Sequence, residues 1–380
     1  MTNYPIYLDY NATTPCDPAV LEVMLPFFNT HFGNAASKSH AFGWYAEEAV
    51  HFAREQVASL IGADPLEIIF TSGATESVNL AIRGYAESNT LRGRHIITVT
   101  TEHKAVLEVC EYLATEGYEI SVLPVDSHGM ISVEQLESAL RPDTLLVAAM
   151  YANNETGVIF PIGEIGALLK SRGIAFFTDA TQAVGKIPLD VQADGIDMMA
   201  FSAHKLYGPK GVGCLYVRKK NPRIELSPLQ YGGGHERKMR SGTLNVPGIV
   251  GMGKAAEICS QLMAAESLRL SALRNKLEEM LLQYPFVKSN VVVDKRLNHV
   301  ANLRFECRDG DQLLKKVSKH IALSSGSACS SVSVSPSHVL SAMGLTEQQA
   351  ISSIRFSLGR FTTPDELDET LRYFSEVLGD

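Results

Sequence analysis

Long apolar runs and clusters of basic residues are both missing from this sequence of 380 residues. No apolar run approaches the roughly 18–20 residues that a membrane-spanning helix needs. The first residues also lack the basic stretch and apolar centre that are typical of a signal peptide. The formal net charge is −8 and lysine and arginine form no basic arm, so the sequence favours neither a membrane nor a nucleic acid as a direct partner. We therefore expect a cytoplasmic protein.

The fingerprints of nucleotide-binding and zinc-binding sites are absent as well. The sequence contains no G-x-x-x-x-G-K-[ST], no G-x-G-x-x-G after its first predicted strand and no H-E-x-x-H. Its cysteines form no C-x-x-C pair, which argues against a zinc site and against a disulfide framework. We therefore expect no metal. The six cysteines are Cys16, Cys110, Cys214, Cys259, Cys307 and Cys329.

Short apolar runs alternate with helical patterns between about residues 66 and 217, and this alternation predicts the fold class. Such runs, separated by helices, are typical of an α/β protein with a mainly parallel sheet that helices cover on both faces. After about residue 246 the pattern changes to longer amphipathic helices, which predicts a smaller α+β domain. The chain length also favours two domains. The predicted strands cover residues 67–71, 95–100, 144–150, 174–178, 197–201 and 213–217.

Polar residues that suit an aldehyde cofactor follow the first five of these strands. In open α/β sheets, ligands bind beyond the carboxyl ends of the strands. A lysine there can form a Schiff base, an acid can pair with a pyridinium nitrogen, and hydroxyl groups or a helix N-terminus can hold a phosphate. Helix capping explains each residue alone, but together they indicate one ligand site. The segments are Ser72-Gly73-Ala74-Thr75-Glu76, Thr101-Glu102-His103, Asn153-Asn154-Glu155, Asp179-Ala180-Thr181-Gln182 and Ser202-Ala203-His204-Lys205.

A serine-rich segment, residues 324–337, surrounds one cysteine. Eight of its fourteen residues are serine, so it has few apolar side chains with which to join a core and is typical of a mobile loop. Cys329 lies near its centre, in a setting that suits a reactive thiolate. For the other five cysteines the sequence predicts buried structural thiols. Composition alone leaves open whether Cys329 is a nucleophile.

In this order and spacing, these segments resemble the pyridoxal 5'-phosphate (PLP)-dependent cysteine desulfurases of the NifS/IscS type, in the aminotransferase class V family. The resemblance is to the group with a long serine-rich catalytic loop (group I), and it runs essentially from end to end. Besides the segments above, it includes Leu8-Asp9-Tyr10-Asn11-Ala12-Thr13-Thr14, Phe32-Gly33-Asn34, Arg240-Ser241-Gly242-Thr243, Ser324-Ser325-Gly326-Ser327-Ala328-Cys329 and Ile354-Arg355-Phe356-Ser357.

The resemblance implies a fold, an activity and partners. The fold would be the PLP-dependent transferase fold type I, with a mainly parallel seven-stranded sheet. Residues 15–258 would form the large PLP-binding domain, and residues 1–14 with 259–380 the small domain that carries the catalytic loop at about 324–337. A homodimer would convert L-cysteine to L-alanine. Cys329 would receive the sulfur as a persulfide and pass it to an acceptor protein, such as an iron–sulfur scaffold or a component of another thiolation pathway.

Four residues would act on the cofactor ring by this resemblance. Lys205 would bind PLP covalently and later move protons at the substrate Cα, and Asp179 would pair with the pyridine nitrogen. Gln182 would hydrogen-bond the phenolic oxygen of the ring. His103 would stack on the ring and act as a proton donor or acceptor.

The same resemblance assigns residues to the phosphate group and to the substrate. Arg355 would bind the substrate carboxylate, because a guanidinium offers the two-pronged contact that a carboxylate needs. Asn154 and Asn34 would assist it, and Asn154 would contact the cofactor as well. The phosphate ligands would be Ala74 (through its main chain), Thr75, Ser202, His204 and, from the neighbouring subunit, Thr243.

Three alternative functions remain open on the sequence. An aminotransferase would use Lys205 and Asp179 but has no need of Cys329. A selenocysteine lyase is harder to separate, because desulfurases often accept selenocysteine. A non-catalytic, partner-binding protein on the same fold would be expected to have lost Lys205 or Asp179, and both are present.

Overall fold

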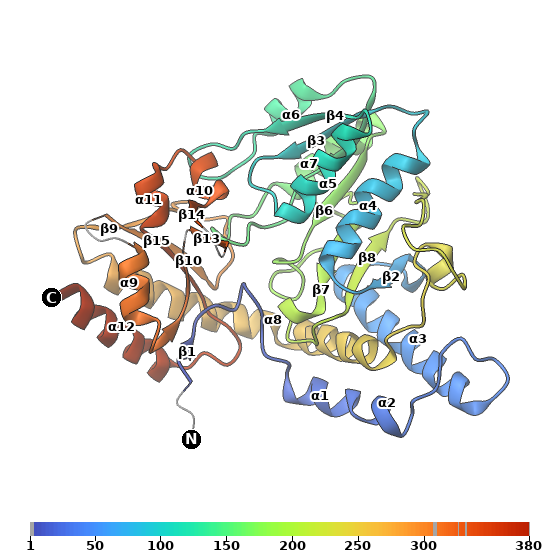
Figure 1. The fold of residues 1–380 in the computed structure, drawn as a ribbon, viewed down its shortest axis with the longest axis horizontal. Helices are drawn as coiled ribbons and strands as arrows, with labels where there is room; N and C mark the ends of the chain where they lie inside the picture. Colours follow the sequence, from blue (N-terminus) through green and yellow to red (C-terminus); the bar gives the residue numbers. More distant parts are fainter. Residues whose placement is uncertain (1–3, 307–309, 326, 331–332, 380) are drawn as a thin grey trace.

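The computed structural model describes the backbone of residues 4–306, 310–325, 327–330 and 333–379. These residues form a larger body around a central sheet and a smaller body built from the C-terminal part of the chain and the first strand (Figure 1). The long helix α8 (Val246–Leu281) runs from the larger body into the smaller one. No helix within these ranges is long and apolar enough to cross a membrane.

The central sheet has seven strands in the order β2-β8-β7-β6-β5-β3-β4. Strand β8 is antiparallel to both of its neighbours, and the other neighbouring pairs are parallel. The predicted α/β fold with a mainly parallel seven-stranded sheet is therefore confirmed. The strands are β2 (Ile68–Thr71), β3 (His95–Val99), β4 (Glu119–Leu123), β5 (Thr144–Ala148), β6 (Ala175–Asp179), β7 (Met198–Ser202) and β8 (Gly213–Val217).

Strand β4 has no counterpart among the strands that the sequence predicts. It lies at the edge of the sheet, where it pairs with β3, and four of its five residues are exposed or only partly buried. A continuous apolar run signals a strand that is buried on both faces. A half-exposed edge strand does not produce this signal, which explains the omission.

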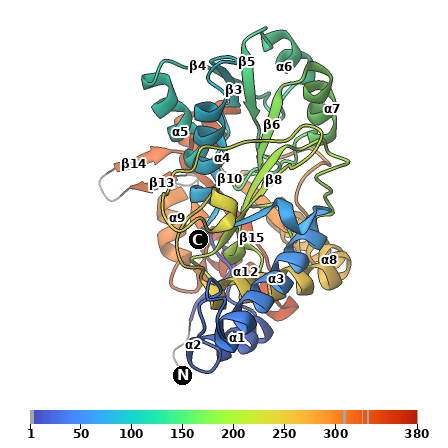
Figure 2. The same ribbon diagram turned by 90° about the vertical axis from the view of Figure 1, so that its right-hand side faces the viewer.

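Adjacent residues of the central strands point to opposite faces of the sheet and join different cores. In β6, Phe176 packs in the core shared with α3, α7 and the first part of α8, whereas Phe177 packs in the core shared with α4 and α5. Figure 2 shows these helices on the two faces. The helices of this body are α1 (Pro18–Met24), α2 (Pro26–Asn29), α3 (Ala41–Ile61), α4 (Ala74–Ser88), α5 (Lys104–Thr115), α6 (Val133–Ala139) and α7 (Ile162–Arg172).

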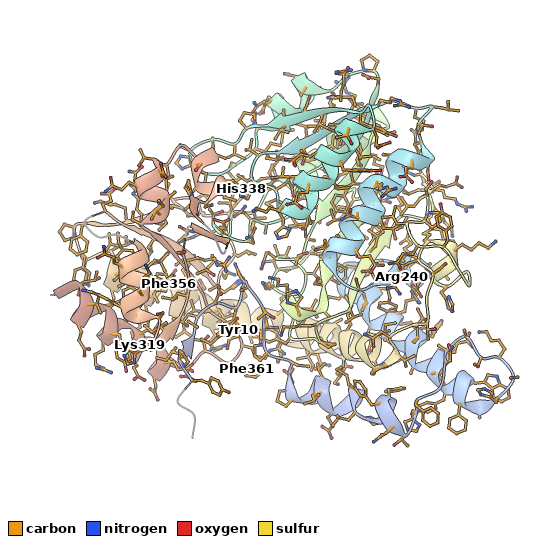
Figure 3. All side chains as sticks on the ribbon, in the orientation of Figure 1. Tyr10, Arg240, Lys319, His338, Phe356 and Phe361 are labelled. Atoms are coloured by element: carbon orange, nitrogen blue, oxygen red, sulfur yellow. The ribbon has the colours of Figure 1, made fainter. Side chains whose placement is uncertain are left out.

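The smaller body contains a four-stranded antiparallel sheet in the order β12-β15-β10-β9. Its core includes the fully buried rings of Phe305, Phe374 and Phe356, the last of which is labelled in Figure 3. Strand β1 (Ile6–Tyr7) pairs with β11 (Ile321–Ala322), so the N-terminal segment packs with this body. The other elements are β9 (Val287–Ser289), β10 (Val300–Phe305), β12 (Ser324–Ser325), β15 (Ser353–Ser357), α9 (Gly310–Val317), α10 (His338–Ala342), α11 (Glu347–Ile351) and α12 (Pro364–Gly379).

The predicted domain boundary near residue 258 falls inside helix α8. The part of α8 up to Cys259 packs in the core of the larger body, and the part from Leu270 onward packs in the core of the smaller body. One continuous helix therefore joins the two bodies. The division of the chain into residues 15–258 and the remainder stays a prediction.

The serine-rich segment, for which the sequence predicts a mobile loop, contains two strands. Strands β13 (Ser327–Ser330) and β14 (Ser333–Pro336) pair in antiparallel fashion, with Cys329 opposite Val334. Main-chain hydrogen bonds between adjacent strands need no apolar side chains, so a serine-rich composition is compatible with a hairpin. Residues 326, 331 and 332, and the side chain of Cys329, lie outside the described part of the structure.

The central sheet can be tested by truncating one of its buried rings. Phe177→Ala removes a fully buried ring from β6 and should lower the free energy of unfolding by about 3–5 kcal/mol, because the cavity left behind is only partly refilled. Urea denaturation followed by circular dichroism measures this change. The control is Leu91→Ala, at a fully exposed side chain, with an expected change within about 0.5 kcal/mol. Equal effects of the two substitutions would contradict the placement of Phe177.

Candidate active site

A cavity of about 380 Å³ lies where the strands of the larger body end, facing the smaller body. Arg355 reaches it from β15, and the N-terminal segment contributes Asn11 and Ala12. Because parallel strands end at the same edge of a sheet, residues far apart in the sequence meet there. Ten of the predicted site residues line this cavity: Ala74, Thr75, His103, Asn154, Asp179, Gln182, Ser202, His204, Lys205 and Arg355.

Short turns after the strands place most of these side chains. Asp179 and Ser202 are the last residues of β6 and β7, and Lys205 closes the short 3-10 helix Ala203–Lys205. Ala74 begins α4. His103 caps the start of α5, because its Nδ1 accepts a hydrogen bond from a main-chain amide of that helix at 3.1 Å. The central sheet therefore fixes the relative positions of these residues.

A hydrogen bond connects the two bodies next to His103. His338, at the start of α10, hydrogen-bonds through Nε2 to the main-chain oxygen of Glu102 at 2.9 Å. Figure 3 labels His338 where the smaller body approaches the central sheet. This contact joins the segment that follows the serine-rich hairpin to one wall of the cavity.

Polar groups gather at one end of the cavity, around the start of α4. The Ala74 N–H donates to Ser202 Oγ at 2.7 Å, and the helix dipole adds partial positive charge there. His204 Nδ1 lies 3.1 Å from Thr13 Oγ1. Burial, and then the charge of Lys205, lower the pKa of His204 to about 4, so its ring is neutral at pH 7. This end of the cavity thus offers hydroxyl, amide and imidazole groups to an anion.

Lys205 has main-chain oxygens as its hydrogen-bond partners. Its Nζ donates to the oxygen of Ala12 at 2.6 Å and also to that of Asn11. Burial, and then the positive charge of Arg355, lower the pKa of Lys205 from 10.5 to about 8. A larger share of this amine is therefore neutral near pH 8 than for an ordinary lysine, and the neutral amine is the nucleophilic form.

A second, fully buried carboxyl group interacts with Asp179. Asp179 Oδ1 accepts a hydrogen bond from the Thr181 N–H at 2.9 Å. Glu102 accepts one from the Met150 N–H. Burial, and then the charge of Asp179, raise the pKa of Glu102 well above its ordinary value. Both effects favour the protonated form of Glu102, which limits the negative charge beside Asp179.

Gln182 is oriented by a lysine to which the sequence analysis assigns no role. Gln182 Oε1 accepts a hydrogen bond from Lys186 Nζ at 2.7 Å, and its Nε2 donates to the main-chain oxygen of Asn11 at 3.0 Å. Burial, and then the charge of Lys205, lower the pKa of Lys186 well below its ordinary value. The main-chain oxygen of Asn11 can only accept, so it determines that Nε2 is the donor end of the amide, and Lys186 Nζ bonds to the other end. In the sequence, Lys186 is linked to Gln182 only by a separation of four residues. This separation is too common to indicate a site.

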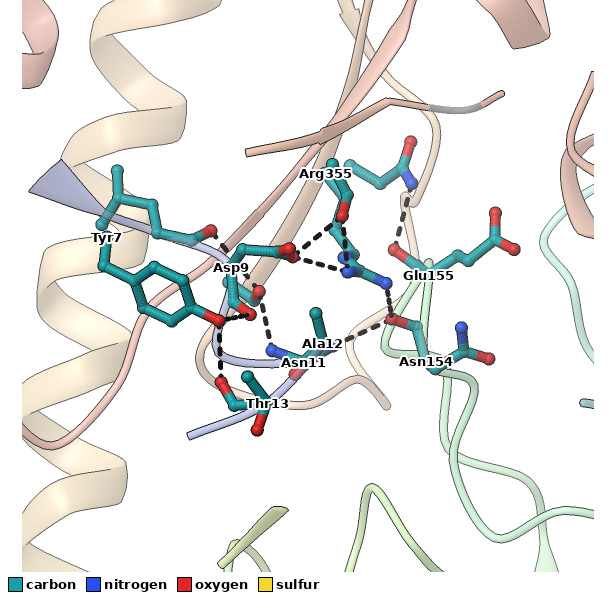
Figure 4. Close-up of polar contacts among 12 residues, drawn as sticks. Tyr7, Asp9, Asn11, Ala12, Thr13, Asn154, Glu155 and Arg355 are labelled. Carbon is teal, nitrogen blue, oxygen red and sulfur yellow. Dashed lines mark hydrogen bonds and ion pairs between the residues drawn. The ribbon is translucent and has the colours of Figure 1, made fainter. Parts of the chain in front are cut away.

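Arg355 is held by the main chain and by two side chains before any ligand binds (Figure 4). Its Nη1 donates to the main-chain oxygen of Asn154 at 3.0 Å, and its Nη2 donates to Asp9 Oδ1 at 2.6 Å and to Ser324 Oγ at 2.9 Å. Asn11 Nδ2 donates to the same Asn154 oxygen at 2.9 Å. Asp9 and Asn11 lie in one of the segments that carry the family resemblance, but neither residue is predicted to have a role in the site.

Of the other three predicted site residues, Asn34 and Thr243 lie outside the cavity lining. Asn34 is exposed, and its Oδ1 accepts a hydrogen bond from the Ala36 N–H at 2.9 Å. Thr243 is exposed in the turn before α8. Cys329 lies in β13, and its side chain is outside the described part of the structure. The roles of these three residues stay predictions, as do the roles of the ten residues that line the cavity.

The other cysteines mostly lie where buried structural thiols are expected. Cys110, Cys214 and Cys259 are buried, and burial raises the pKa of Cys110 to about 12 and that of Cys259 to about 11. Such thiols are protonated and inert at neutral pH. Cys16 is only partly buried, so the prediction of a buried thiol is wrong for it. Cys307 lies outside the described residues.

The lowered pKa of Lys205 can be measured in the protein freed of bound aldehyde. The rate of acetylation of Lys205, followed by peptide mass spectrometry, should rise with pH around a midpoint near 8 and not near 10.5. Arg355→Gln removes a positive charge that disfavours the protonated amine, so its midpoint should move upward. Arg141→Gln, at an arginine paired with exposed carboxylates, should leave the midpoint unchanged. Equal midpoints for all three proteins would contradict this electrostatic account.

The chain matches known proteins over nearly its whole length. Residues 6–370 match the family model described as aminotransferase class-V. A cysteine desulfurase IscS of Anaeromyxobacter dehalogenans (strain 2CP-C) is 54% identical over 373 residues, which are 98% of this chain and 92% of that relative. A cysteine desulfurase IscS of Escherichia coli O139:H28 is 51% identical over 377 residues, 99% of this chain and 93% of that relative.

Solved structures of related proteins have the same fold. A NifS-like protein has a TM-score of 0.92 and 38% identity, covering 99% of this chain and 100% of its own. DndA from Streptomyces lividans has a TM-score of 0.78 and 43% identity, covering 91% of this chain and 97% of its own. These findings confirm the resemblance that the sequence segments indicate. The chain belongs to the aminotransferase class V family, in the group of NifS/IscS-type cysteine desulfurases.

Proposed function

We propose that this chain converts L-cysteine to L-alanine with the help of PLP and passes the sulfur through Cys329 to an acceptor protein. The observation that carries the proposal is the cavity, which brings Lys205, Asp179, His103 and Arg355 together at the strand ends. An amine, a carboxylate, an imidazole and a guanidinium in one cavity are the groups that PLP chemistry on an amino acid needs.

The residues around the cavity fit PLP. Within the described residues, Lys205 Nζ bonds to main-chain oxygens and to no carboxylate, so no ion pair has to break before the amine reacts. The start of α4 and the hydroxyl group of Ser202 offer a place for the phosphate. Asp179 offers a carboxylate to the ring nitrogen, and Gln182 offers an amide donor to the phenolic oxygen. Because the side chains are already held by the sheet, little reorganisation is needed on binding.

When bound, PLP supplies an electron sink for the electron pair that the substrate Cα releases. Lys205 removes the proton from Cα, because its lowered pKa leaves much of the amine neutral near pH 8. Asp179 holds a proton at the ring nitrogen. His103 serves as the second proton donor or acceptor. Arg355 holds the substrate carboxylate, and this fixes the orientation of the amino acid in the cavity.

Transfer of the substrate sulfur to the enzyme requires one thiol and no external oxidant. The Cys329 thiolate attacks the substrate sulfur, an S–S bond forms, and the bond between the substrate Cβ and its sulfur breaks. The electron pair of the broken bond stays with the three-carbon fragment, which takes up protons and leaves as alanine. The β13–β14 hairpin carries the persulfide, and its acceptor is an iron–sulfur scaffold or a component of another thiolation pathway.

We also propose that the protein is a cytoplasmic homodimer. Helices α1–α3 lie at the outer edge of the larger body (Figure 1). Large apolar side chains are exposed on and beside them. They include Phe28, Phe32, Trp44 and Phe52, whose exposed fractions are 62%, 65%, 56% and 59%. An apolar surface of this kind is typical of a protein–protein interface. Thr243, which is exposed, then completes the phosphate site of the partner subunit.

The sulfur-acceptor role is tested with the PLP-loaded protein and L-cysteine. The wild-type protein should release alanine, and sulfide when a reducing thiol is present. Cys329→Ser should retain the colour of bound PLP and lose alanine formation by more than about 100-fold, as expected when a nucleophile is removed. Cys16→Ser serves as the matched control and should keep its activity. Equal rates of alanine formation by wild type and Cys329→Ser would contradict the role of Cys329.

The dimer is tested by placing charges on the exposed apolar side chains. A Phe28→Glu, Trp44→Glu double variant should sediment as a monomer at micromolar concentration. The free energy needed to bury two unpaired carboxylates in the interface exceeds the free energy gained from the contact between the subunits. It should also bind PLP more weakly, because Thr243 no longer reaches a neighbouring site. The control variant Leu91→Glu, at an exposed residue outside α1–α3, should stay dimeric. A monomeric wild-type protein, or a dimeric double variant, would contradict the proposed interface.

A further inference from the structure

Arg355, Asp9 and Ser324 form a closed triangle of hydrogen bonds beside the cavity. Arg355 Nη2 donates to Asp9 Oδ1 at 2.6 Å and to Ser324 Oγ at 2.9 Å, and Ser324 Oγ donates to the same Asp9 oxygen at 2.9 Å. Figure 4 shows Asp9 directed at the guanidinium from the N-terminal segment. The three residues come from two ends of the chain, so the triangle exists only in the folded protein.

The ion pair within this triangle is largely shielded from water. The side chains of Arg355 and Asp9 are exposed to only 10% and 16%. Removing one partner of a shielded pair leaves the other charge without compensation, which costs more than losing an exposed pair. The contact therefore limits the positions that the Arg355 side chain can adopt.

The triangle determines which donors of Arg355 remain for a ligand. A guanidinium has five N–H donors in one plane. Asp9 and Ser324 take those of Nη2, and the main-chain oxygen of Asn154 takes one from Nη1. The Nε of Arg355 is buried and has no hydrogen-bond partner within the described part of the chain. An unsatisfied buried donor next to the cavity is a place for an incoming carboxylate oxygen.

We propose that Asp9 is a positioning residue for the substrate carboxylate, acting through the guanidinium of Arg355. Asp9 is not among the residues that line the cavity, so it acts without touching the ligand. By holding Nη2, it fixes the orientation of the guanidinium and leaves Nε–H and the second Nη1–H without a partner among the described residues. These two hydrogens are not adjacent on the guanidinium, so a carboxylate oxygen accepts from one of them. This inference rests on the proposed function, in which Arg355 binds the carboxylate of the amino acid.

The same contact ties the carboxylate anchor to the segment that carries Cys329. Ser324 is the partner of Arg355 in the pairing of β12 with β15, and it begins the serine-rich segment. Asp9 therefore holds both the arginine and the base of the strand that leads toward the hairpin. One aspartate sets the position of the substrate anchor relative to the start of the sulfur-accepting segment.

The experiment compares two ligands that differ only in the carboxylate. L-alanine is the proposed product, and ethylamine is the same molecule without its carboxylate. Each is titrated into the PLP-loaded protein while the absorption of the bound cofactor is followed. Asp9→Ala should weaken alanine binding by about tenfold, the loss expected for one hydrogen bond to a charged group, and leave ethylamine binding unchanged. Asp9→Asn keeps an oxygen acceptor for Nη2 and should stay within about threefold of wild type.

Two further variants separate positioning from general damage to the fold. Ser324→Ala removes one corner of the triangle and should weaken alanine binding by about threefold, again without an effect on ethylamine. Asp17→Ala removes one of the two carboxylate partners of another shielded arginine, Arg360. Neither residue lines the cavity, so this variant should change neither affinity. Cofactor absorption without added ligand reports whether each variant is folded and loaded.

The titrations distinguish failure of the positioning role of Asp9 from failure of the proposed function. Parallel losses for alanine and ethylamine in Asp9→Ala, unchanged alanine binding, or tighter alanine binding would each overturn the positioning role while leaving the proposed function intact. Selective loss in Asp9→Ala with recovery in Asp9→Asn would support it. A wild-type protein that binds no PLP would overturn the proposed function and this inference together.

Discussion

The hydrogen bonds of Asn11 hold together the parts of the chain that surround the cavity. Its N–H donates to Ser357 Oγ at 3.0 Å, its Nδ2 donates to the main-chain oxygen of Asn154, and its Oδ1 lies 2.9 Å from His299 Nε2. Its own main-chain oxygen accepts from Lys205 and from a neighbouring amide side chain. Asn11 is 1% exposed, so losing any one partner would leave a buried polar group unsatisfied, at about 1–3 kcal/mol. Asn11 thereby connects residues of both bodies with the reactive lysine.

Basic side chains gather around this residue, and their crowding determines the character of the site. Burial and neighbouring cations lower the pKa of Lys205, Lys186, His204 and His299 alike. The protein thus keeps basic groups close together by holding several of them in their neutral forms. Such a site suits ligands that bring their own negative charges, such as a phosphate group and an amino acid carboxylate.

The sequence predicts most strands of the central sheet and the polar residues that follow them. Both signals come from residues that are adjacent in the sequence. An apolar run buried on both faces identifies β6, and the residue that ends it, Asp179, follows directly. The edge strand β4 and the β13–β14 hairpin depend on main-chain pairing, for which these residues give no apolar signal. Lys186 and Asp9 are missed for a different reason. Lys186 contacts Gln182 only four residues away, a spacing that carries no signal of its own, whereas the contact between Asp9 and Arg355 spans 346 positions.

The pairing of β1 with β11 has a consequence for the order in which the molecule is made. Ile321 and Ala322 are synthesised more than 300 positions after their partners Ile6 and Tyr7. Strand β1 therefore waits without its sheet partner until those residues have been made, and so does the neighbouring segment that lines the cavity. Long-range pairings of this kind form late. A nascent chain can thus complete its central sheet while the reactive lysine still lacks its hydrogen-bond partners, and the catalytic centre is assembled only after β11 has been synthesised.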